Sequence, residues 1–431
     1  MNRNILKDIF FDHHQHWEAF KKKHEAKVRP IVIKEVEKFR DCGDIKKGFK
    51  LFVCEGCHDI RKVPYRCKGR FCTTCSVGES EEWSRLLTED VLQVNHRHVI
   101  FTIDEGLREV FLLHRHLLKG LMDAASKLIT DFFQKKAKVA PGIISGLHTF
   151  GLRVNFNPHV HMLVTMGGLT EKGEWKQYDF LPFAMLQKQW QTVVLKLIRN
   201  GVSEEEKKII QPRLQKVFTN NGEGFYVYAP KQRGKIKEQL RYIDRYIRRP
   251  AIGINRIEAY DGQYVTFKYK DKMDGKEKTE TVSVEEFISR LIRHIPDEQF
   301  KTIRHYGMYS RRTKKLCKKV LSARQQGAKR KVKKTLRRQT WRERLMASGR
   351  KDPLVCPRCE CYYEYKGEVC LENGKLEIKV ALCKTTRAYL ERVISNLTGI
   401  KNPQKRKEKE EKRTIKPVPE TERQLCLFSV S

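Results

Sequence analysis

The chain has 431 residues and carries 89 lysine and arginine residues against 52 aspartate and glutamate residues, giving a formal net charge of +37. This excess of positive charge points to an acidic partner such as nucleic acid, bound through phosphate contacts that salt weakens steeply. With 39% hydrophobic residues, no apolar run of about eighteen residues and no secretory signal, the sequence predicts a cytoplasmic protein of two to four domains without a membrane span.

Cysteine pairs dominate the first part of the chain. Two C-x-x-C pairs lie fourteen residues apart, the spacing typical of a closed, tetrahedral zinc site in a reducing compartment. A redox pair would need only one such motif, at the start of a helix in a β-α-β setting. We therefore predict a structural zinc ion whose ligands are Cys54, Cys57, Cys72 and Cys75.

The number of zinc ions is left open by three further residues nearby. Cys67 could replace one of the four ligands, or it could join Cys42 and His58 around a second ion.

From about residue 95 the pattern changes to mixed α and β structure. Strands and helices in this order favour an antiparallel sheet with helices on one face. The expected strands are 98–103, 143–150, the segment around 159–164, 224–228, 252–260, 264–270 and 278–282, and the expected helices are 107–132, 180–199, 204–218, 235–249 and 287–295.

The strand around residue 160 carries the first candidate catalytic residues. In an extended strand alternate side chains share a face, so His159 and His161 project together while Val160 and Met162 point into the packing. Two imidazoles on one face can chelate a divalent cation, although a half-exposed sheet surface is the plainer interpretation of the pattern alone.

The expected helix 235–249 carries the second candidates. Tyr242 and Tyr246 are four residues apart, which places both phenols on one side of a helix about one turn apart, either as two nucleophiles or as a packing pair. Arg245, Arg248 and Arg249 on the same segment are candidate phosphate contacts, or they only satisfy the helix C-terminus.

A basic region and a third cysteine pair follow. Residues 311–344 contain sixteen lysines or arginines and one acid, and we expect this partly helical stretch to bind DNA phosphates through residues such as Lys329, Arg330, Lys333 and Lys334. Cys356 and Cys359 form a single C-x-x-C pair. Whether it binds zinc with Cys361, Cys370 or Cys383 is left open. Residues 402–424 are expected to be disordered.

The histidine pair followed by the tyrosine pair resembles the HUH endonucleases, in which a histidine-hydrophobic-histidine strand holds the metal and a downstream helical tyrosine attacks DNA. Two tyrosines with three residues between them are similar to those of rolling-circle transposases, both the bacterial insertion-sequence kind and Helitrons. Residues 63–72, 305–312 and 352–359 also resemble segments of the insertion-sequence transposases and of their zinc-binding domain.

The resemblance implies an α+β fold with a ferredoxin-like, antiparallel nuclease core. It also implies a rolling-circle DNA transposase that nicks and rejoins single-stranded DNA at transposon ends and target through a 5′-phosphotyrosine, associated with the nucleoid if bacterial. On this basis we expect four regions: a zinc-binding domain (1–90), a catalytic domain (91–310), a basic region with the last cysteine pair (311–400) and a tail (401–431).

The catalytic ion is expected to be Mg²⁺ or Mn²⁺, and because imidazole alone binds these poorly, a third protein ligand is needed. The sequence offers His148 on the preceding strand and Gln239 or Glu238 on the tyrosine helix; Asp244 lies about 200° round that helix from Tyr242 and ranks lower.

Two other functions share parts of this pattern. A plasmid replication initiator or relaxase would use the same histidine and tyrosine chemistry, without the zinc module and family-like C-terminal segments. A non-catalytic zinc protein that binds nucleic acid would need both pairs to be structural.

Overall fold

The computed structural model describes residues 4–230 except 93, residues 251–313 except 272–273, residues 317, 339–340, 342–343 and 346, and residues 351–399. The chain forms two compact units that alternate along the sequence. Unit 1 comprises residues 1–40 and 67–348, and unit 2 comprises residues 41–66 and 349–431. The units therefore do not follow the linear succession of regions expected from the sequence.

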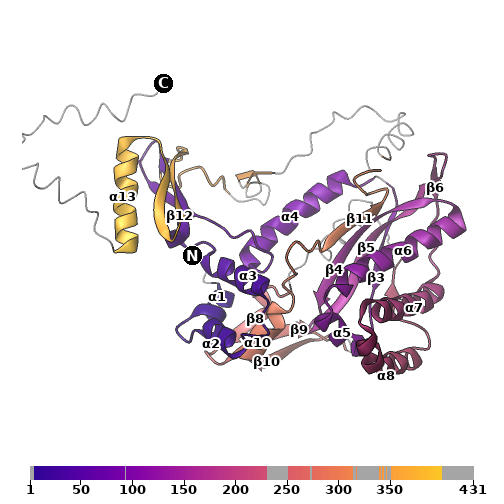
Figure 1. Ribbon diagram of the computed structural model, residues 1–431. Helices are drawn as coiled ribbons and strands as arrows, with labels where there is room; N and C mark the ends of the chain where they lie inside the picture. The colour runs from indigo at the N-terminus through magenta and orange to yellow at the C-terminus, as the bar shows by residue number, and fades with distance from the viewer. Residues whose placement is uncertain are drawn as a thin grey trace, which may run out of the picture. The chain divides into compact units, whose positions relative to one another are not determined.

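An antiparallel sheet forms the centre of unit 1, with strand order β11-β4-β5-β3-β7 and β6 paired to β5 (Figure 1). The histidine strand β5 thus lies in the middle of the sheet. Its strands are β3 (His96–Phe101), β4 (Ala140–Phe150), β5 (Phe156–Leu169), β6 (Trp175–Gln177), β7 (Val227–Tyr228) and β11 (Ile303–Gly307).

One face of this sheet packs on helices α6 (Leu117–Ala137) and α7 (Phe183–Gly201). Alternate residues of β5, namely Val160, Met162 and Val164, are buried in that core, as the strand pattern predicted. Burying apolar side chains there stabilises the fold by about 25 cal/mol per Å² of apolar surface removed from water. The polar residues between them consequently point to the other face.

The expected helix 107–132 is two helices in the structure. Helix α5 (Arg108–Leu113) ends at His114, and α6 begins at Leu117 and continues to a left-handed residue, Lys138. Helix α8 (Glu204–Asn220) begins with a capping box between Ser203 and Glu206, which satisfies two of its terminal N–H groups.

The remaining elements of unit 1 are a three-stranded antiparallel sheet, order β10-β9-β8, and the helices packed near it. The strands are β8 (Ile257–Tyr260), β9 (Tyr264–Lys270) and β10 (Glu277–Ser283); the helices are α1 (Ile5–Phe11), α2 (His16–Lys23), α3 (Pro30–Asp41) and α10 (Val284–Ile292). Helix α4 (Thr73–Asp90) instead packs on the central sheet, where Leu87 joins Ile144 and Leu163 in a buried cluster.

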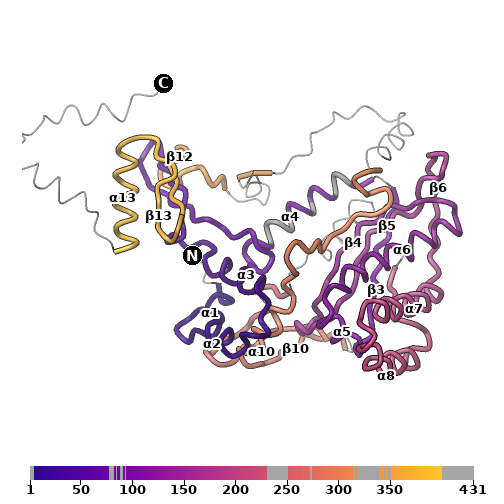
Figure 2. The backbone as a smooth tube through the Cα atoms, in the orientation of Figure 1, coloured from indigo at the N-terminus to yellow at the C-terminus, as the bar shows by residue number. Residues whose placement is uncertain are grey.

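Unit 2 joins an early segment of the chain, residues 41–66, to the late segment from residue 349 in one antiparallel sheet, order β13-β12-β1-β2. Figure 2 shows its early strands beside the late ones, and Gly48 pairs with Cys370 at one end of the β1 and β12 register. Helix α13 (Lys384–Thr398) packs on the sheet through Leu390 and Val393. The strands are β1 (Gly48–Cys54), β2 (Ile60–Pro64), β12 (Tyr363–Glu372) and β13 (Lys375–Ala381).

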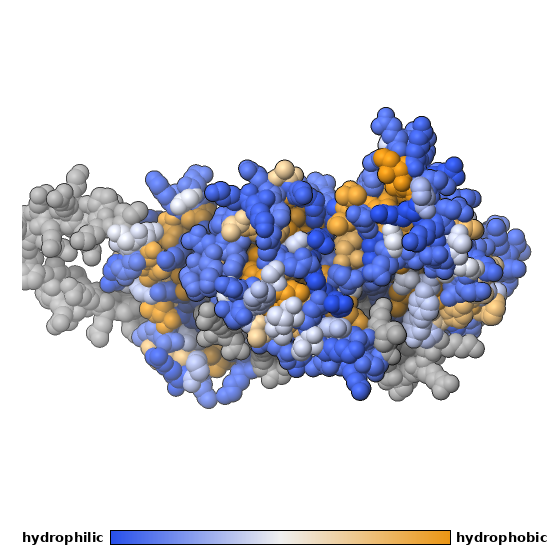
Figure 3. All heavy atoms as spheres, turned by 90° about the horizontal axis from the view of Figure 1, so that it is seen from below, coloured by the Kyte–Doolittle hydropathy of each residue, from blue (hydrophilic) through white to orange (hydrophobic). Residues whose placement is uncertain are grey.

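Mixed helix and antiparallel sheet in these units confirm the α+β class. Hydrophilic residues cover most of the face seen in Figure 3, as expected for a chain with 33% charged residues. Among the described residues, no helix combines the length and apolar character that crossing a bilayer requires.

Candidate functional site

Three histidines meet on the sheet face of unit 1 opposite helices α6 and α7. His148 of β4 and His159 and His161 of β5 each offer a ring nitrogen, and these nitrogens lie within 4.8 Å of one another. Ring centroids are 4.4 Å apart for His148 and His161, 4.9 Å for His159 and His161, and 5.4 Å for His148 and His159. The three rings therefore surround a point where one cation could bind.

Strand register explains this meeting. His148 pairs directly with His159, and His161 lies two residues further along β5, opposite Gly146. The register shifts between His148 and Phe150, so that β5 has an extra residue next to Pro158. A bulge tolerates a proline that cannot donate to the ladder, and bulges of this kind re-aim neighbouring side chains.

Hydrogen bonds select which nitrogen of two rings faces the cation. His159 Nδ1 lies 2.7 Å from the backbone oxygen of Asn157, which can only accept, so Nδ1 carries the proton and Nε2 the lone pair. His161 Nδ1 lies 2.9 Å from Nε2 of His98 on β3. If Nδ1 of His161 donates to His98, Nε2 of His161 is likewise the donor atom for a metal.

Burial disfavours the charged form of His161 in this cluster and of its neighbour His98. His161 and His148 are 4% and 5% exposed. Desolvation, followed by the charges of the neighbouring imidazoles, holds the pKa of His161 well below its usual range. Burial also lowers the pKa of His98 to about 4. Neutral imidazole is the form that binds metal, so His161 is ready to bind a cation at neutral pH.

Imidazole nitrogens without a carboxylate suit a first-row transition ion better than Mg²⁺. Of the third ligands that the sequence offered, the structure brings His148 to the pair. The other predicted residues of this region and of the basic stretch lie outside the described residues: Glu238, Gln239, Tyr242, Asp244, Arg245, Tyr246, Arg248, Arg249, Lys329, Arg330, Lys333 and Lys334, together with the tail 401–431.

A second donor group lies within unit 2 and consists of four thiols. The sulfur atoms of Cys54, Cys57, Cys356 and Cys359 lie within 4.8 Å of one another. Cys54 Sγ is 3.3 Å from Cys359 Sγ, and Cys57 Sγ is 3.6 Å from Cys356 Sγ. Zinc bonds of 2.3 Å in a tetrahedron require sulfur separations of about 3.8 Å, so the group fits one zinc ion.

Local backbone supports these thiolates. Burial would raise the pKa of the Cys356 thiol, but backbone N–H groups of Arg358 and Cys359 outweigh it and lower the pKa to about 6. At Gly56 a Cβ atom would lie 2.5 Å from Cys361 Sγ, so the tight turn between Cys54 and Cys57 requires glycine.

A third donor group in unit 1 contains Cys67, Cys72 and Cys75. Their sulfurs lie within 4.8 Å of one another, with Cys67 Sγ 3.7 Å from Cys75 Sγ. Cys72 is the N-terminal cap residue of α4, and Cys67 Sγ accepts a hydrogen bond from the backbone of Gly69. The group ties the loop 67–72 to the start of the helix.

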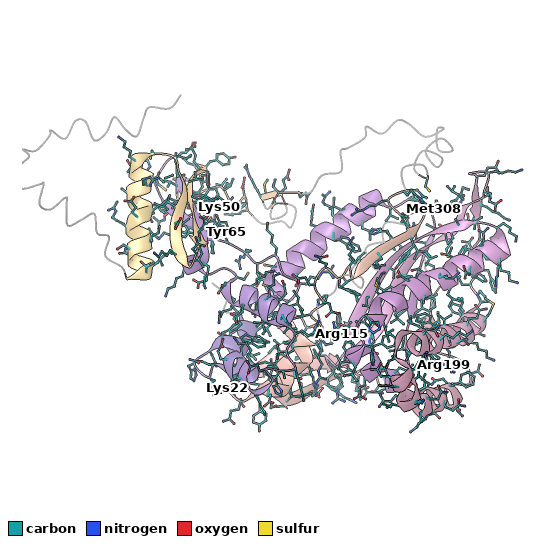
Figure 4. All side chains as sticks on the ribbon, viewed as in Figure 1. Lys22, Lys50, Tyr65, Arg115, Arg199 and Met308 are labelled. Carbon is teal, nitrogen blue, oxygen red and sulfur yellow. The ribbon has the colours of Figure 1, made fainter. Side chains whose placement is uncertain are left out.

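The predicted set of Cys54, Cys57, Cys72 and Cys75 around one ion is therefore not the grouping in the structure, which assigns the two pairs to different units. The late pair Cys356 and Cys359 completes the group that begins with Cys54 and Cys57. Elsewhere in unit 2, Cys370 contacts the Tyr65 hydroxyl at 3.4 Å and Cys383 caps α13; Tyr65 is labelled in Figure 4.

Two family models match the segments of the chain that carry these residues. A family model described as "Transposase zinc-binding domain" matches residues 12–103, and one described as "Putative transposase" matches residues 142–317. The first range contains Cys54, Cys57 and the unit 1 thiols. The second contains the three histidines and the two tyrosines.

Two bacterial relatives are similar over much of their length. The transposase for insertion sequence element IS801 from Pseudomonas savastanoi pv. phaseolicola is 29% identical over 304 residues, 67% of this chain and 72% of that protein. The "Putative transposase y4qJ" of Sinorhizobium fredii is 26% identical over 291 residues, 63% of this chain and 72% of that protein. No solved structure matched the chain. Because a zinc-binding model and then a transposase model match in succession, and both relatives are transposases by name, the chain belongs to the insertion-sequence transposases of the IS91 type.

Proposed function

We propose that the chain nicks and rejoins single-stranded DNA at transposon ends and target sites, in rolling-circle fashion, through a 5′-phosphotyrosine. The observation that carries the proposal is the set of three imidazoles on adjacent central strands, two of them buried and one partly buried, inside the segment that the transposase model matches.

His148, His159 and His161 would hold the catalytic cation, and the donor set fits Mn²⁺ better than Mg²⁺. When bound, this ion polarises a non-bridging oxygen of the scissile phosphate and offsets charge in the transition state. The chain's own contribution is to fix the imidazoles: the Asn157 backbone oxygen fixes the tautomer of His159, and His98 orients the ring of His161.

Tyr242 and Tyr246 supply the nucleophiles. The hydroxyl of one tyrosine loses its proton as its oxygen bonds to phosphorus, and the bond from phosphorus to the 3′ oxygen breaks, so that the departing strand takes up a proton as a 3′-hydroxyl. Attack of a 3′-hydroxyl on the phosphotyrosine reverses these steps and joins strands without ATP. Two tyrosines let one end stay attached while the other cleaves a second strand.

The remaining parts of the chain would bind structural zinc and DNA phosphates. Structural zinc is expected at the four thiols of unit 2, and a second ion at the three thiols of unit 1. Cys42, which follows α3 directly in the sequence, is the candidate to test as an added ligand of the second ion. Phosphates would be contacted by the arginines beside the tyrosines and by the lysines and arginines of residues 311–344.

A nicking assay with tyrosine variants tests the proposal. Each single variant, Tyr242→Phe or Tyr246→Phe, should still form a covalent adduct on a single-stranded oligonucleotide carrying the element's end, yet fail in complete transposition. The double variant should form no adduct. Tyr264→Phe, an exposed tyrosine on β9, serves as the control. Adduct formation by the double variant would overturn the tyrosine assignment, and Mn²⁺-independent cleavage would overturn the metal site.

A further inference from the structure

Unit 1 contains a cavity of about 570 Å³ that reaches the histidine cluster, because His148 forms part of its wall. Pockets that enclose small organic ligands have volumes in this range. The wall is formed by strand β4 on one side and by the loop 67–71 that follows Cys67 on another. The metal ligand and the thiol-bound loop thus border the same space.

An aromatic ring continues the metal site into this cavity. Phe150, two residues after His148 on β4, stacks on the His148 ring with centroids 5.0 Å apart and an interplanar angle of 19°. Phe150 is only half-buried, unlike the core phenylalanines of the unit. Its ring therefore offers an aromatic surface to whatever occupies the space beside His148.

The other ring neighbour of Phe150 fixes its position. His294 contacts Phe150 edge to face, with centroids 5.8 Å apart, and its two nitrogens are engaged by the Thr149 hydroxyl at 3.1 Å and the Val154 backbone oxygen at 3.0 Å. Because His294 is held on both sides, Phe150 packs against a rigid group. A platform held in this way loses little conformational freedom when a ligand stacks on it.

The charged residues of the wall are mostly cationic and would attract the phosphates on either side of a nucleobase, which is itself uncharged. The lining residues include five lysines and arginines and three carboxylates. Two lysines of helix α3 form ion pairs: Lys34 with Glu298 of the segment after α10 at 2.8 Å, and Lys38 with Glu35 of the same helix at 2.6 Å. Arg115, labelled in Figure 4, is paired with Asp297 at 3.2 Å. The cations Lys68 and Arg70 come from the thiol-bound loop.

We propose that this cavity receives a nucleobase of the bound DNA strand, unstacked from its neighbours and stacked on Phe150, next to the phosphate held at the histidine cluster. The inference rests on the proposed function, and it adds a contact to the base where that function requires only contacts to phosphate. Stacking on an aromatic side chain accepts any base, so the cavity positions the strand without reading its sequence.

A binding experiment isolates this contact from catalysis. The full chain with Tyr242→Phe and Tyr246→Phe is titrated with an oligothymidylate of about 16 nucleotides and with an abasic strand of equal length, and the dissociation constant of each is measured. Phe150→Ala should weaken binding of the oligothymidylate by about 5- to 150-fold, the loss typical of one stacked base. Binding of the abasic strand should change little, because its phosphates are still contacted.

Two controls keep the test decisive. Phe180→Ala removes an exposed ring, 63% accessible, outside the cavity lining and should alter neither affinity. Phe150→Trp should retain the preference for bases, and Phe150→Leu, which keeps apolar volume without a ring, should lose it even if Phe150→Ala folds poorly.

Equal effects of Phe150 variants on both strands, or none on either, would overturn the inference. If Phe150→Ala on the wild-type tyrosine background nicks normally and keeps its preference for bases, the cavity assignment fails while the proposed function stands. If the wild-type chain forms no phosphotyrosine but the base preference depends on Phe150, the proposed chemistry fails and the binding site stands.

Discussion

The four thiols of unit 2 and the three histidines of unit 1 are both groups of metal-binding side chains, but they are built in opposite ways. The thiols come from two tight turns and surround a point on all sides, with sulfur separations near the edge of a zinc tetrahedron. The histidines supply only three donors, from adjacent strands, and one of them borders a cavity.

This difference separates a site that holds the fold from a site that can accept a substrate. A closed set of four ligands leaves no position for an incoming oxygen, whereas three protein ligands leave positions open. The cavity beside His148 is where the proposed function would place the DNA strand.

The largest effect on folding is expected from removing one thiol of the four-cysteine group in unit 2. Cys54→Ser or Cys356→Ser should lower the zinc-to-protein ratio by one and unfold unit 2, because zinc binding to small modules supplies about 10–16 kcal/mol of apparent free energy. Limited proteolysis should then cut within residues 351–399. Intrinsic fluorescence should change little, since all five tryptophans fall in the sequence ranges of unit 1.

Cys383→Ser is the matched control for that prediction. Cys383 lies in the same unit and caps α13 by accepting a hydrogen bond from the Thr386 backbone N–H, a role that serine performs equally well. Unchanged zinc content in both Cys54→Ser and Cys356→Ser would rule out the four-thiol grouping.

Substitutions in the three-histidine cluster of unit 1 should lower nicking activity without unfolding the protein. His159→Ala or His161→Ala should reduce Mn²⁺-dependent nicking by more than about 10²-fold, the loss seen when a single group that stabilises a transition state is removed. Binding of single-stranded DNA should persist, because affinity comes mainly from the basic surface. His305→Ala, an exposed histidine on edge strand β11, is the control.

Equal nicking by the His159→Ala, His161→Ala double variant and the unmodified chain would exclude the histidine cluster as the catalytic site. Loss of DNA binding in parallel with nicking would instead indicate that the substitutions damage the sheet.

The same comparison explains which parts of the molecule the sequence could predict. Alternation in a strand is a local rule, so the shared face of His159 and His161 and the burial of Val160 and Met162 followed from four consecutive residues. His148 was within reach because it lies on the preceding strand, eleven residues before His159. That its ring meets those of His159 and His161 follows from the strand register, whereas Gln239 and Glu238 lie outside the described residues.

The thiol groups could not be sorted by local rules. Spacing shows that Cys54 and Cys57 form one half of a site, but it does not show which other pair completes it. In the structure the partner is Cys356 and Cys359, about 300 residues later, brought there by the pairing of β1 with β12. His98 was also missed, since only the register of β3 on β5 places it against His161.

A smaller effect is expected from His98, which touches a metal ligand and not the metal. His98→Phe removes the ring nitrogen that faces His161 Nδ1 at 2.9 Å and should weaken Mn²⁺ activation by about 10- to 100-fold, as is typical of such supporting contacts. Because His161 itself is retained, high Mn²⁺ concentration should restore most of the nicking rate.

His98→Gln should retain more of the affinity, since its amide oxygen can accept the same hydrogen bond. If His98→Phe and His98→Gln lower the maximal rate equally and excess Mn²⁺ restores neither, the role of His98 is structural.

The smallest expected effect is on the pH dependence of stability, which should differ between the two units. Burial lowers the pKa of His294 to about 4, against about 6.5 in an unfolded chain. Between those values the unfolded state binds more protons, so the free energy of unfolding of unit 1 is retained above pH 6.5 and falls as the pH drops toward 4. One such histidine contributes a slope of up to about 1.4 kcal/mol per pH unit.

Urea unfolding followed by tryptophan fluorescence measures that slope for unit 1. The His294→Gln variant should lower this slope by the equivalent of about one bound proton, because glutamine does not titrate. Its free energy of unfolding above pH 6.5 should also drop, because packing is lost.

Excess zinc provides the contrast between the two units. Acid weakens unit 2 by protonating thiolates, so added zinc should shift the acid transition of unit 2 to lower pH. Zinc bound at the four thiols of unit 2 should not change the pH dependence of the unfolding free energy that tryptophan fluorescence reports for unit 1. A slope unchanged by His294→Gln would mean that other buried groups of unit 1, such as His96, whose pKa burial also lowers to about 4, dominate its acid sensitivity.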